Sequence, residues 1–196
     1  GVAGVATFRS GRIDVGDSLG NSSIGQRAGE SYTTGTKNTA VGKNALTAVT
    51  TGERNSALGM NALGGSGTGV TNNTALGVNA LYNTTGSSNT ACGDAALYTN
   101  TSGADNTAMG RNALFVNTTG QYNVAIGNYA LDANTTASQN TAVGNYGLSS
   151  NTTGTANVAV GYKALFANTT GQRNSALGID ALGANTTGQY NTAVGR

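Results

Sequence analysis

The stretch NVAVGYKALFANTTGQR, from Asn157 to Arg173, is one unit of a 17-residue pattern that fills most of this chain. The pattern reads N-T-A-V-G-x-x-A-L-x-x-N-T-T-G-x-x, and we number its positions one to seventeen from the leading Asn. A fixed period of this kind indicates a repeat architecture and has to be recognised before individual strands or helices are assigned. The leading asparagines are Asn21, Asn38, Asn55, Asn73, Asn89, Asn106, Asn123, Asn140, Asn157, Asn174 and Asn191.

The spacing of these asparagines divides the chain into two parts. Every step is 17 residues except an 18-residue step after Asn55 and a 16-residue step after Asn73, so the two irregularities cancel. Residues 21–196 are therefore one repeat array, which stops within its last unit. Residues 1–20 do not follow the pattern, although Ile13-Asp14-Val15-Gly16 resembles a degenerate strand of it. We interpret residues 1–20 as a cap or a joint to an upstream region, and we expect the chain to be a segment of a longer protein.

The composition is unlike that of an ordinary soluble domain. Charged residues make up 9% of the chain, against about 25% in typical domains, and there are 31 Gly but no Pro, Trp or His. Apolar residues nevertheless recur at fixed positions, which argues against a disordered low-complexity segment. The net charge of +2 is scattered, so we expect no nucleic-acid partner. No run approaches the roughly 20 apolar residues of a membrane span, so we expect no membrane insertion.

Two columns of the repeat supply the predicted core. Position four is apolar in every regular unit, and position nine is Leu, preceded by Ala or once by Gly. Since neighbouring residues of an extended chain point to opposite faces, the invariant Ala at position three indicates that both faces of the strand are covered. The Ala-Leu pair of positions eight and nine is interpreted as a second extended segment, whose two side chains also point to opposite faces. The predicted core residues are Val41, Leu58, Leu76, Cys92, Met109, Ile126, Val143, Val160 and Leu177 at position four, and Leu46, Leu63, Leu81, Leu97, Leu114, Leu131, Leu148, Leu165 and Leu182 at position nine.

The pattern predicts an all-β fold, a parallel β-solenoid or β-roll of 17-residue coils. Thr, Val and a Gly every few residues leave no helix of ordinary length, and the chain lacks the Asn-Gly and Asp-Gly dipeptides of tight hairpins. Gly after each strand and the Asn-Thr-Thr-Gly segment are interpreted as turns, because Asn and Gly tolerate left-handed backbone angles. Each unit offers about four dependable core residues, against an ordering cost of roughly 1–2 kcal/mol per residue. We therefore expect the second strand face to meet other copies, most simply in a parallel homotrimer.

The repeat resembles two families of fibrous proteins. Asn123-Val124-Ala125-Ile126-Gly127 and Asn174-Ser175-Ala176-Leu177-Gly178 are similar to the head repeats of trimeric autotransporter adhesins of the YadA-like type. Strings of N-T-A-V-G-x-x-A-L-x-x-N-T-T-G also resemble the shafts of phage tail fibres and related bacterial fibres, and this match fits the 17-residue period better. The resemblance implies a left-handed roll wound as a homotrimeric fibre, possible end-to-end filaments, and a location outside the cell, on its surface or on a virion tail.

The sequence carries no constellation that predicts catalysis, a metal or a cofactor. Without His there is no nucleophile–base pair of the usual kinds, and the eight carboxylates fall at different repeat positions. The aromatic residues of position ten, Tyr82, Tyr98, Phe115 and Phe166, predict either a surface that binds sugars or a partner, or stacking between coils, which we favour. Asn117 and Asn168 begin Asn-Thr-Thr sequons, which predict either N-glycans or, as we favour, turn residues.

Two functions fit these observations. The first is a non-enzymatic fibre shaft that presents an attachment tip. The alternative is an adhesin head that itself binds a cell surface, a glycan or ice. Ice binding would require two outward Thr columns at alternate positions, whereas Thr118 and Thr119 are adjacent.

Overall fold

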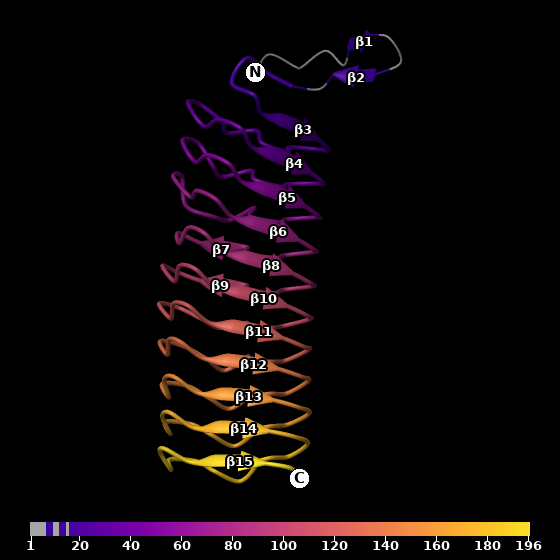
Figure 1. Cartoon of the computed structure of the whole chain (residues 1–196). Coiled ribbons are helices and arrows are strands. Elements are labelled where there is room, and N and C mark those ends of the chain that lie inside the picture. The colour runs from indigo at the N-terminus through magenta and orange to yellow at the C-terminus, as the bar shows by residue number, and fades with distance from the viewer. Residues whose placement is uncertain (1–6, 10–11, 15) are drawn as a thin grey trace.

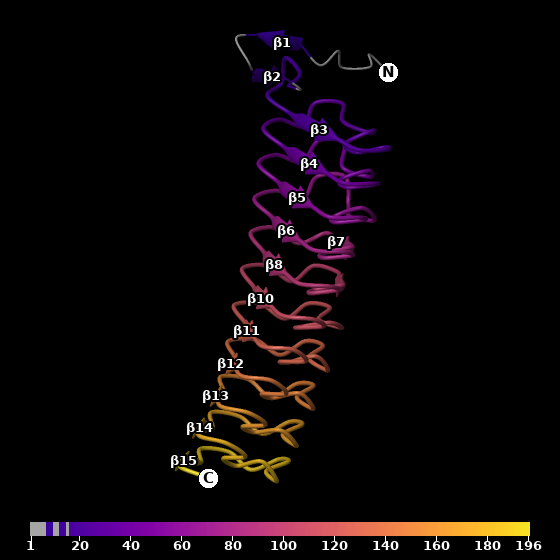
Figure 2. The same cartoon turned by 90° about the vertical axis from the view of Figure 1, so that its right-hand side faces the viewer.

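The chain is a parallel β-solenoid without a helix in the residues that its structure, a computed structural model, describes: 7–9, 12–14 and 16–196. Eleven short strands stack into one parallel sheet in the order β15-β14-β13-β12-β11-β10-β8-β6-β5-β4-β3 (Figures 1 and 2). These strands are β3 (Ser22–Ile24), β4 (Thr39–Val41), β5 (Ser56–Leu58), β6 (Thr74–Leu76), β8 (Thr90–Cys92), β10 (Thr107–Met109), β11 (Val124–Ile126), β12 (Thr141–Val143), β13 (Val158–Val160), β14 (Ser175–Leu177) and β15 (Thr192–Val194). The predicted all-β solenoid of 17-residue coils is confirmed.

In the sheet, residues at the same repeat position pair with one another in neighbouring strands. Ala108 of β10 pairs with Ala125 of β11, one 17-residue unit further on. Ala75 also pairs with Ala57 and with Ala91, across the 18-residue and 16-residue steps. The irregular units therefore absorb their extra and missing residues away from the sheet, where a short parallel pair forms between β7 (Asn83–Thr84) and β9 (Thr99–Asn100).

The N-terminal strands do not belong to this sheet. β1 (Thr7–Arg9) and β2 (Arg12–Asp14) pair antiparallel with each other and lie beyond the first coil (Figure 1). The degenerate strand expected at Ile13-Asp14 is thus half of a hairpin, not a coil of the stack. Val15 of that motif lies outside the described residues.

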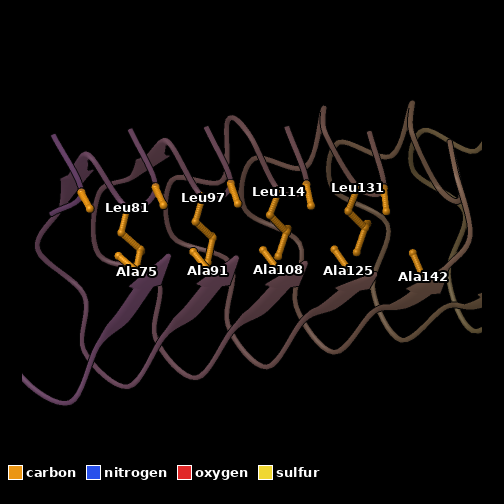
Figure 3. Close-up of a cluster of buried hydrophobic side chains, with 14 of the residues drawn as sticks. Ala75, Leu81, Ala91, Leu97, Ala108, Leu114, Ala125, Leu131 and Ala142 are labelled. Carbon is orange, nitrogen blue, oxygen red and sulfur yellow. The ribbon is translucent and has the colours of Figure 1, made fainter. Parts of the chain in front are cut away.

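The interior of each coil is filled from its two sides. The position-three Ala points inward from the sheet, and the Leu of position nine reaches it from the opposite segment, as Figure 3 shows for Leu114 and Ala108. Both are fully buried. Eight of the nine predicted leucines, from Leu46 to Leu165, are fully buried, while Leu182 is partly buried. A side chain as small as Ala is required at position three because the facing Leu occupies the narrow space between the two layers.

The Ala-Leu segment is a turn, not the second extended segment that the sequence suggested. Ala113 and Leu114 are both buried, and Leu114 has a left-handed backbone with φ 52°. Alternation between faces holds only for extended backbone, so the expectation that these neighbours point to opposite sides was wrong. The segment still joins the coils, because the backbone N–H of Leu114 donates to the carbonyl of Ala130 at 3.0 Å.

The position-four residues lie on the outside of the coil, contrary to their predicted place in the core. The sheet has one inner face, which the position-three Ala occupies, so the residue that follows must point outward. The residues concerned are Val41, Leu58, Leu76, Cys92, Met109, Ile126, Val143, Val160 and Leu177, which are exposed or half-buried.

A ladder of buried asparagines runs along the stack at position one. In the first rung, the backbone N–H and the side-chain Nδ2 of Asn38 both donate to Oδ1 of Asn21, at 2.9 and 3.1 Å. Nδ2 also donates to the carbonyl of Gly52 at 2.8 Å. The backbone bond recurs in each following coil to Asn191. Because each amide both donates and accepts, the ladder satisfies polar groups that water cannot reach.

A second ladder at position twelve begins at Asn100. Asn117 donates from Nδ2 to Oδ1 of Asn100 at 2.7 Å and to the carbonyl of Gly120 at 3.0 Å, and Asn134 bonds in the same way to Asn117. Asn117 and Asn168 lie at turns, as the sequence suggested, but not through a left-handed backbone. Each side chain instead donates across the Asn-Thr-Thr-Gly corner to the glycine carbonyl at 3.0 Å. Their buried, hydrogen-bonded amides also leave no room for a glycan.

The first ladder ends in a carboxylate at its N-terminal end. The backbone N–H of Asn21 donates to Oδ1 of Asp17 at 2.8 Å, and Nδ2 of Asn21 donates to Oδ2 at 3.0 Å. Asp17 thus takes the place of the asparagine that a preceding coil would supply. Burial by itself would raise the pKa of Asp17, but the hydrogen bonds from Asn21 and Leu19 outweigh it and hold the pKa below the usual 3.8.

The strands end at a glycine that no other residue can replace without strain. Gly127 at position five has φ 134°, and a Cβ there would lie 2.5 Å from the carbonyl oxygen of Gly144 in the next coil. This glycine turns the chain away from the sheet at the same place in every coil, which leaves positions six and seven around the corner from the outer sheet face.

Candidate functional site

The outer face of the sheet carries a continuous column of apolar side chains, which we call the apolar column. It comprises the position-four residues from Ile24 to Val194, and the register of the sheet places each one directly over the next. Neighbouring strands lie about 4.8 Å apart, so no gap separates successive side chains. The exposed members are Ile24 (52%), Leu58 (51%), Leu76 (43%), Met109 (44%), Ile126 (38%), Leu177 (51%) and Val194 (78%).

The neighbouring column on this face has a different chemistry. Position two holds Thr, Ser or Val, and its side chains lie beside the apolar column. A flat face with one hydroxyl-bearing column and one large apolar column does not provide the two Thr columns that ice binding would require. Near the C-terminal coils the face has a shallow hollow of about 180 Å³. Its lining includes Val158, Val160, Ser175, Leu177, Thr192 and Val194.

The aromatic residues predicted for surface binding separate into two groups. Tyr82, Tyr98 and Phe115 stack in succession, with ring centroids 5.5 and 5.4 Å apart and planes within 15° of parallel. These rings cover one another's faces, as the stacking interpretation predicted. Phe166 lies apart from them, because Asp132 and Ser149 occupy position ten in the two coils between.

Phe166 belongs instead to a second group, which sequence analysis did not identify and which we call the Tyr146 cluster. The rings of Tyr129 and Tyr146 stack with centroids 5.2 Å apart and planes 2° from parallel. Tyr162 and Phe166 each meet Tyr146 edge-on, with centroids 6.4 Å away. The cluster consists of Arg111, Tyr129, Tyr146, Tyr162, Lys163 and Phe166.

A cation lies at each end of the Tyr146 cluster. The guanidinium carbon of Arg111 is 5.7 Å from the centroid of the Tyr129 ring. The ammonium of Lys163 is 5.4 Å from the Tyr162 ring and 5.3 Å from the Phe166 ring. The aromatic residues are half-buried, except that Tyr162 is 45% exposed. Positions six, seven and ten of four successive coils thus meet on one surface, although the repeat gives no fixed residue type to any of them.

The ionisable groups of the described residues form no site with recognisable acid–base chemistry. Burial raises the pKa of Asp132, which accepts a hydrogen bond from the Ser149 hydroxyl at 2.6 Å. Burial likewise raises the pKa of Tyr32, which packs against the core in the first coil. No three His, Cys, Asp or Glu side chains within the described ranges come together as metal ligands. The described part of the chain also contains no helix capable of crossing a membrane.

Comparison with known protein families, curated proteins and solved structures found no match to this chain. The resemblance to fibre repeats therefore rests on the residues of the repeat alone.

Proposed function

We propose that this chain is a segment of a fibre shaft in which three parallel copies pack their apolar columns around a common axis. The apolar column is the observation that carries the proposal. A soluble monomer rarely exposes a long, contiguous apolar surface, and a surface of this kind typically marks an interface. Side chains that repeat at the same height in every coil suit a partner with the same repeat, and a second copy of the chain has that repeat.

The energy available from the column is of the right size for association. Fully burying a Leu or Ile side chain is worth roughly 1.5–3 kcal/mol, so covering the exposed half of one gives about 1 kcal/mol. The column from Ile24 to Val194 has one such residue in each of its coils, and its sum is on the order of 10 kcal/mol per chain. Association costs an estimated 4–15 kcal/mol in lost translational and rotational freedom, so the column is sufficient only if its whole length is used.

The shaft function follows from the uniformity of the coils. The two asparagine ladders and the Leu–Ala interior repeat without change along most of the array, and such a stack gives a rod whose length is set by the number of units. The stoichiometry of three, the left-handed winding, and the location outside the cell or on a virion rest on the resemblance to fibre repeats. A shaft has no need of a catalytic centre, and we propose that the chain is not an enzyme. The alternative function, an adhesin surface, requires a group of ligand-facing side chains, and the Tyr146 cluster is its best candidate.

Cys92 gives a direct test because it is the only cysteine and lies half-buried in the apolar column. A nitroxide label at Cys92 should give short interspin distances between chains, measured by pulsed electron paramagnetic resonance. The control is the Cys92→Ser, Thr119→Cys variant, in which the label sits on an exposed residue of a corner and should give longer distances. Sedimentation equilibrium of the unlabelled chain should give three times 19.3 kDa. A stable folded monomer, or longer distances at Cys92 than at position 119, would overturn the proposal.

A further inference from the structure

The Tyr146 cluster has tyrosine at a left-handed backbone position that several other coils fill with asparagine. Position seven has a left-handed backbone in every coil from Arg27 to Asp180, with φ between 53° and 59°. Four coils place Asn there, the non-glycine residue that tolerates this conformation best. The coils at the cluster place Tyr129 and Tyr146 there instead, with φ 57° and 59°. Asn, Arg, Ala, Lys and Asp hold the same backbone in other coils, so the fold itself does not account for two stacked tyrosines at this position.

The polar groups of the cluster have no partners within the described residues. The hydroxyls of Tyr129, Tyr146 and Tyr162 make no hydrogen bond to any other described residue. The ion pairs among the described residues are Arg27–Glu30 and Arg54–Glu53, both in the N-terminal coils, so neither Arg111 nor Lys163 is in an ion pair with a described carboxylate. The cluster therefore presents three hydroxyls and two cations around partly exposed aromatic rings.

We propose that the Tyr146 cluster binds an extended acidic glycan that lies along the axis of the rod. Sugars combine apolar C–H faces with many hydroxyls, so they fit rings whose edges and hydroxyls are both accessible. Arg111 and Lys163 lie three coils apart, about 14 Å along the axis at 4.8 Å per coil, and each can contact a carboxylate or sulfate of the same chain. Asp94 and Asp180 occupy the next coils outward at positions six and seven, and their charges would confine the acidic ligand to the span between the cations.

A glycan fits this surface better than a protein partner does. Binding hot spots for proteins are well-packed pockets that become fully desolvated, whereas the rings of the cluster are half-buried or exposed at the surface. The cluster is a ridge of stacked rings with repeated chemistry from coil to coil, which matches a polymer with a repeating unit. It lies beyond the position-five glycines, around the corner from the apolar column, so the proposal does not rest on the shaft assembly.

The matched variant is Tyr129→Asn with Tyr146→Asn, because Asn occupies position seven in other coils, such as Asn112, and fits its backbone. Binding of the assembled protein to polygalacturonate, hyaluronan and polysialic acid is measured by biolayer interferometry, with dextran as the neutral probe. We expect saturable binding to at least one acidic glycan, weakened about tenfold or more in this variant, whereas its thermal stability stays equal or rises. The control variant, Tyr82→Ala with Tyr98→Ala, removes the other ring stack and should retain binding.

Charge is tested separately with Arg111→Gln and Lys163→Asn. This pair should weaken binding of the acidic glycan and reduce its dependence on salt, and dextran binding should not change. The proposal is wrong if none of the three acidic glycans binds, if both ring variants lose binding equally, or if dextran binds as well as they do. An array of immobilised peptides is the further probe. If the protein binds peptides but no glycan, and only the Tyr129, Tyr146 variant loses that binding, the cluster belongs to a protein partner and the proposal is overturned. A chain that forms trimers but binds no glycan would refute this proposal alone.

Discussion

Replacing Asn134 by valine measures how much the second asparagine ladder contributes to stability. Asn134 is fully buried at position twelve, where Val49 is accommodated in an earlier coil and is also fully buried. The substitution therefore keeps the volume of the site close to one that the solenoid already tolerates, and the principal loss is that of the amide hydrogen bonds.

The structure shows which neighbours lose their partners. Nδ2 of Asn134 donates to Oδ1 of Asn117 at 2.8 Å, and Oδ1 of Asn117 has no other hydrogen-bond donor among the described residues. The carbonyl of Ala137, its second acceptor, keeps the bond from Asn123 at 2.9 Å. Asn151 loses the Oδ1 of Asn134 at 3.2 Å but keeps its bond to a glycine carbonyl. One buried acceptor is orphaned and one donor is partly unsatisfied, so we expect a loss of about 2–4 kcal/mol in the free energy of unfolding.

The double variant Asn117→Val, Asn134→Val sharpens the test. Together the two single changes orphan Oδ1 of Asn117 and of Asn100, whereas the double variant orphans Asn100 Oδ1 alone. Its cost should therefore be smaller than the sum of the single costs by about 1–3 kcal/mol. Urea unfolding at equal chain concentration gives the overall stability, and amide hydrogen exchange in the flanking coils gives the local free energy, because a repeat array need not unfold in one step. The control is Thr136→Val on the exposed side of the same corner.

Two results would refute this reasoning. If Asn134→Val costs no more than Thr136→Val, within about 0.5 kcal/mol, the ladder does not stabilise the stack. If the costs of Asn117→Val and Asn134→Val simply add, the two amides are not coupled through their shared bond.

Three other perturbations test separate features. Val143→Asp places a charge in the apolar column but not in the coil interior. It should abolish association in sedimentation experiments, while circular dichroism still reports β-structure. Loss of the fold would instead show that Val143 belongs to the core. Asp17 has a lowered pKa in the folded chain, so its stabilising effect is present above the ordinary pKa near 3.8 and is lost as the pH falls through the lower folded value. The side-chain amide signals of Asn21 should change over this pH range, and the Asp17→Asn variant should not show the change. Deleting one whole unit, 140–156, should leave assembly intact because Asn157 then follows Gln139 in register, whereas deleting half a unit should prevent it; normal assembly with lost attachment to a target would place a binding site in these coils.

The repeat period was enough to predict the stacking of the chain, including its register across the two irregular units. It was not enough to place the side chains, because the alternation rule was applied to Ala113-Leu114, where the backbone is left-handed. The repeat did contain a signal. Position nine is Leu from Leu46 onwards, whereas position four varies among Val, Leu, Ile, Met and Cys. A tightly packed interior tolerates one size of side chain, so constancy at position nine and variation at position four indicate which column faces inward.

The asparagine ladders were missed for a similar reason. A residue needed only for its turn conformation is interchangeable with Gly or Asp, yet position one is Asn in all eleven units. That constancy indicates a requirement for a side chain that both donates and accepts, which only an amide satisfies in this shape. The Tyr146 cluster had no comparable signal, because its rings come from positions six, seven and ten, and a column-by-column analysis identifies Phe166 alone.

The inward-facing and outward-facing positions of this solenoid are therefore under different constraints. The ladders, the position-three Ala and the position-nine Leu are needed to close any coil, so they say nothing about function. The apolar column lies outside the coil in every unit, although no coil needs it to fill its interior. The partner that we propose to explain it runs the full length of the rod. The Tyr146 cluster is confined to four coils, so a partner that contacts every coil in the same way does not explain it. A local ligand on a uniform shaft accounts for both observations, and the two are separable because the substitutions that test one lie around the corner from the other.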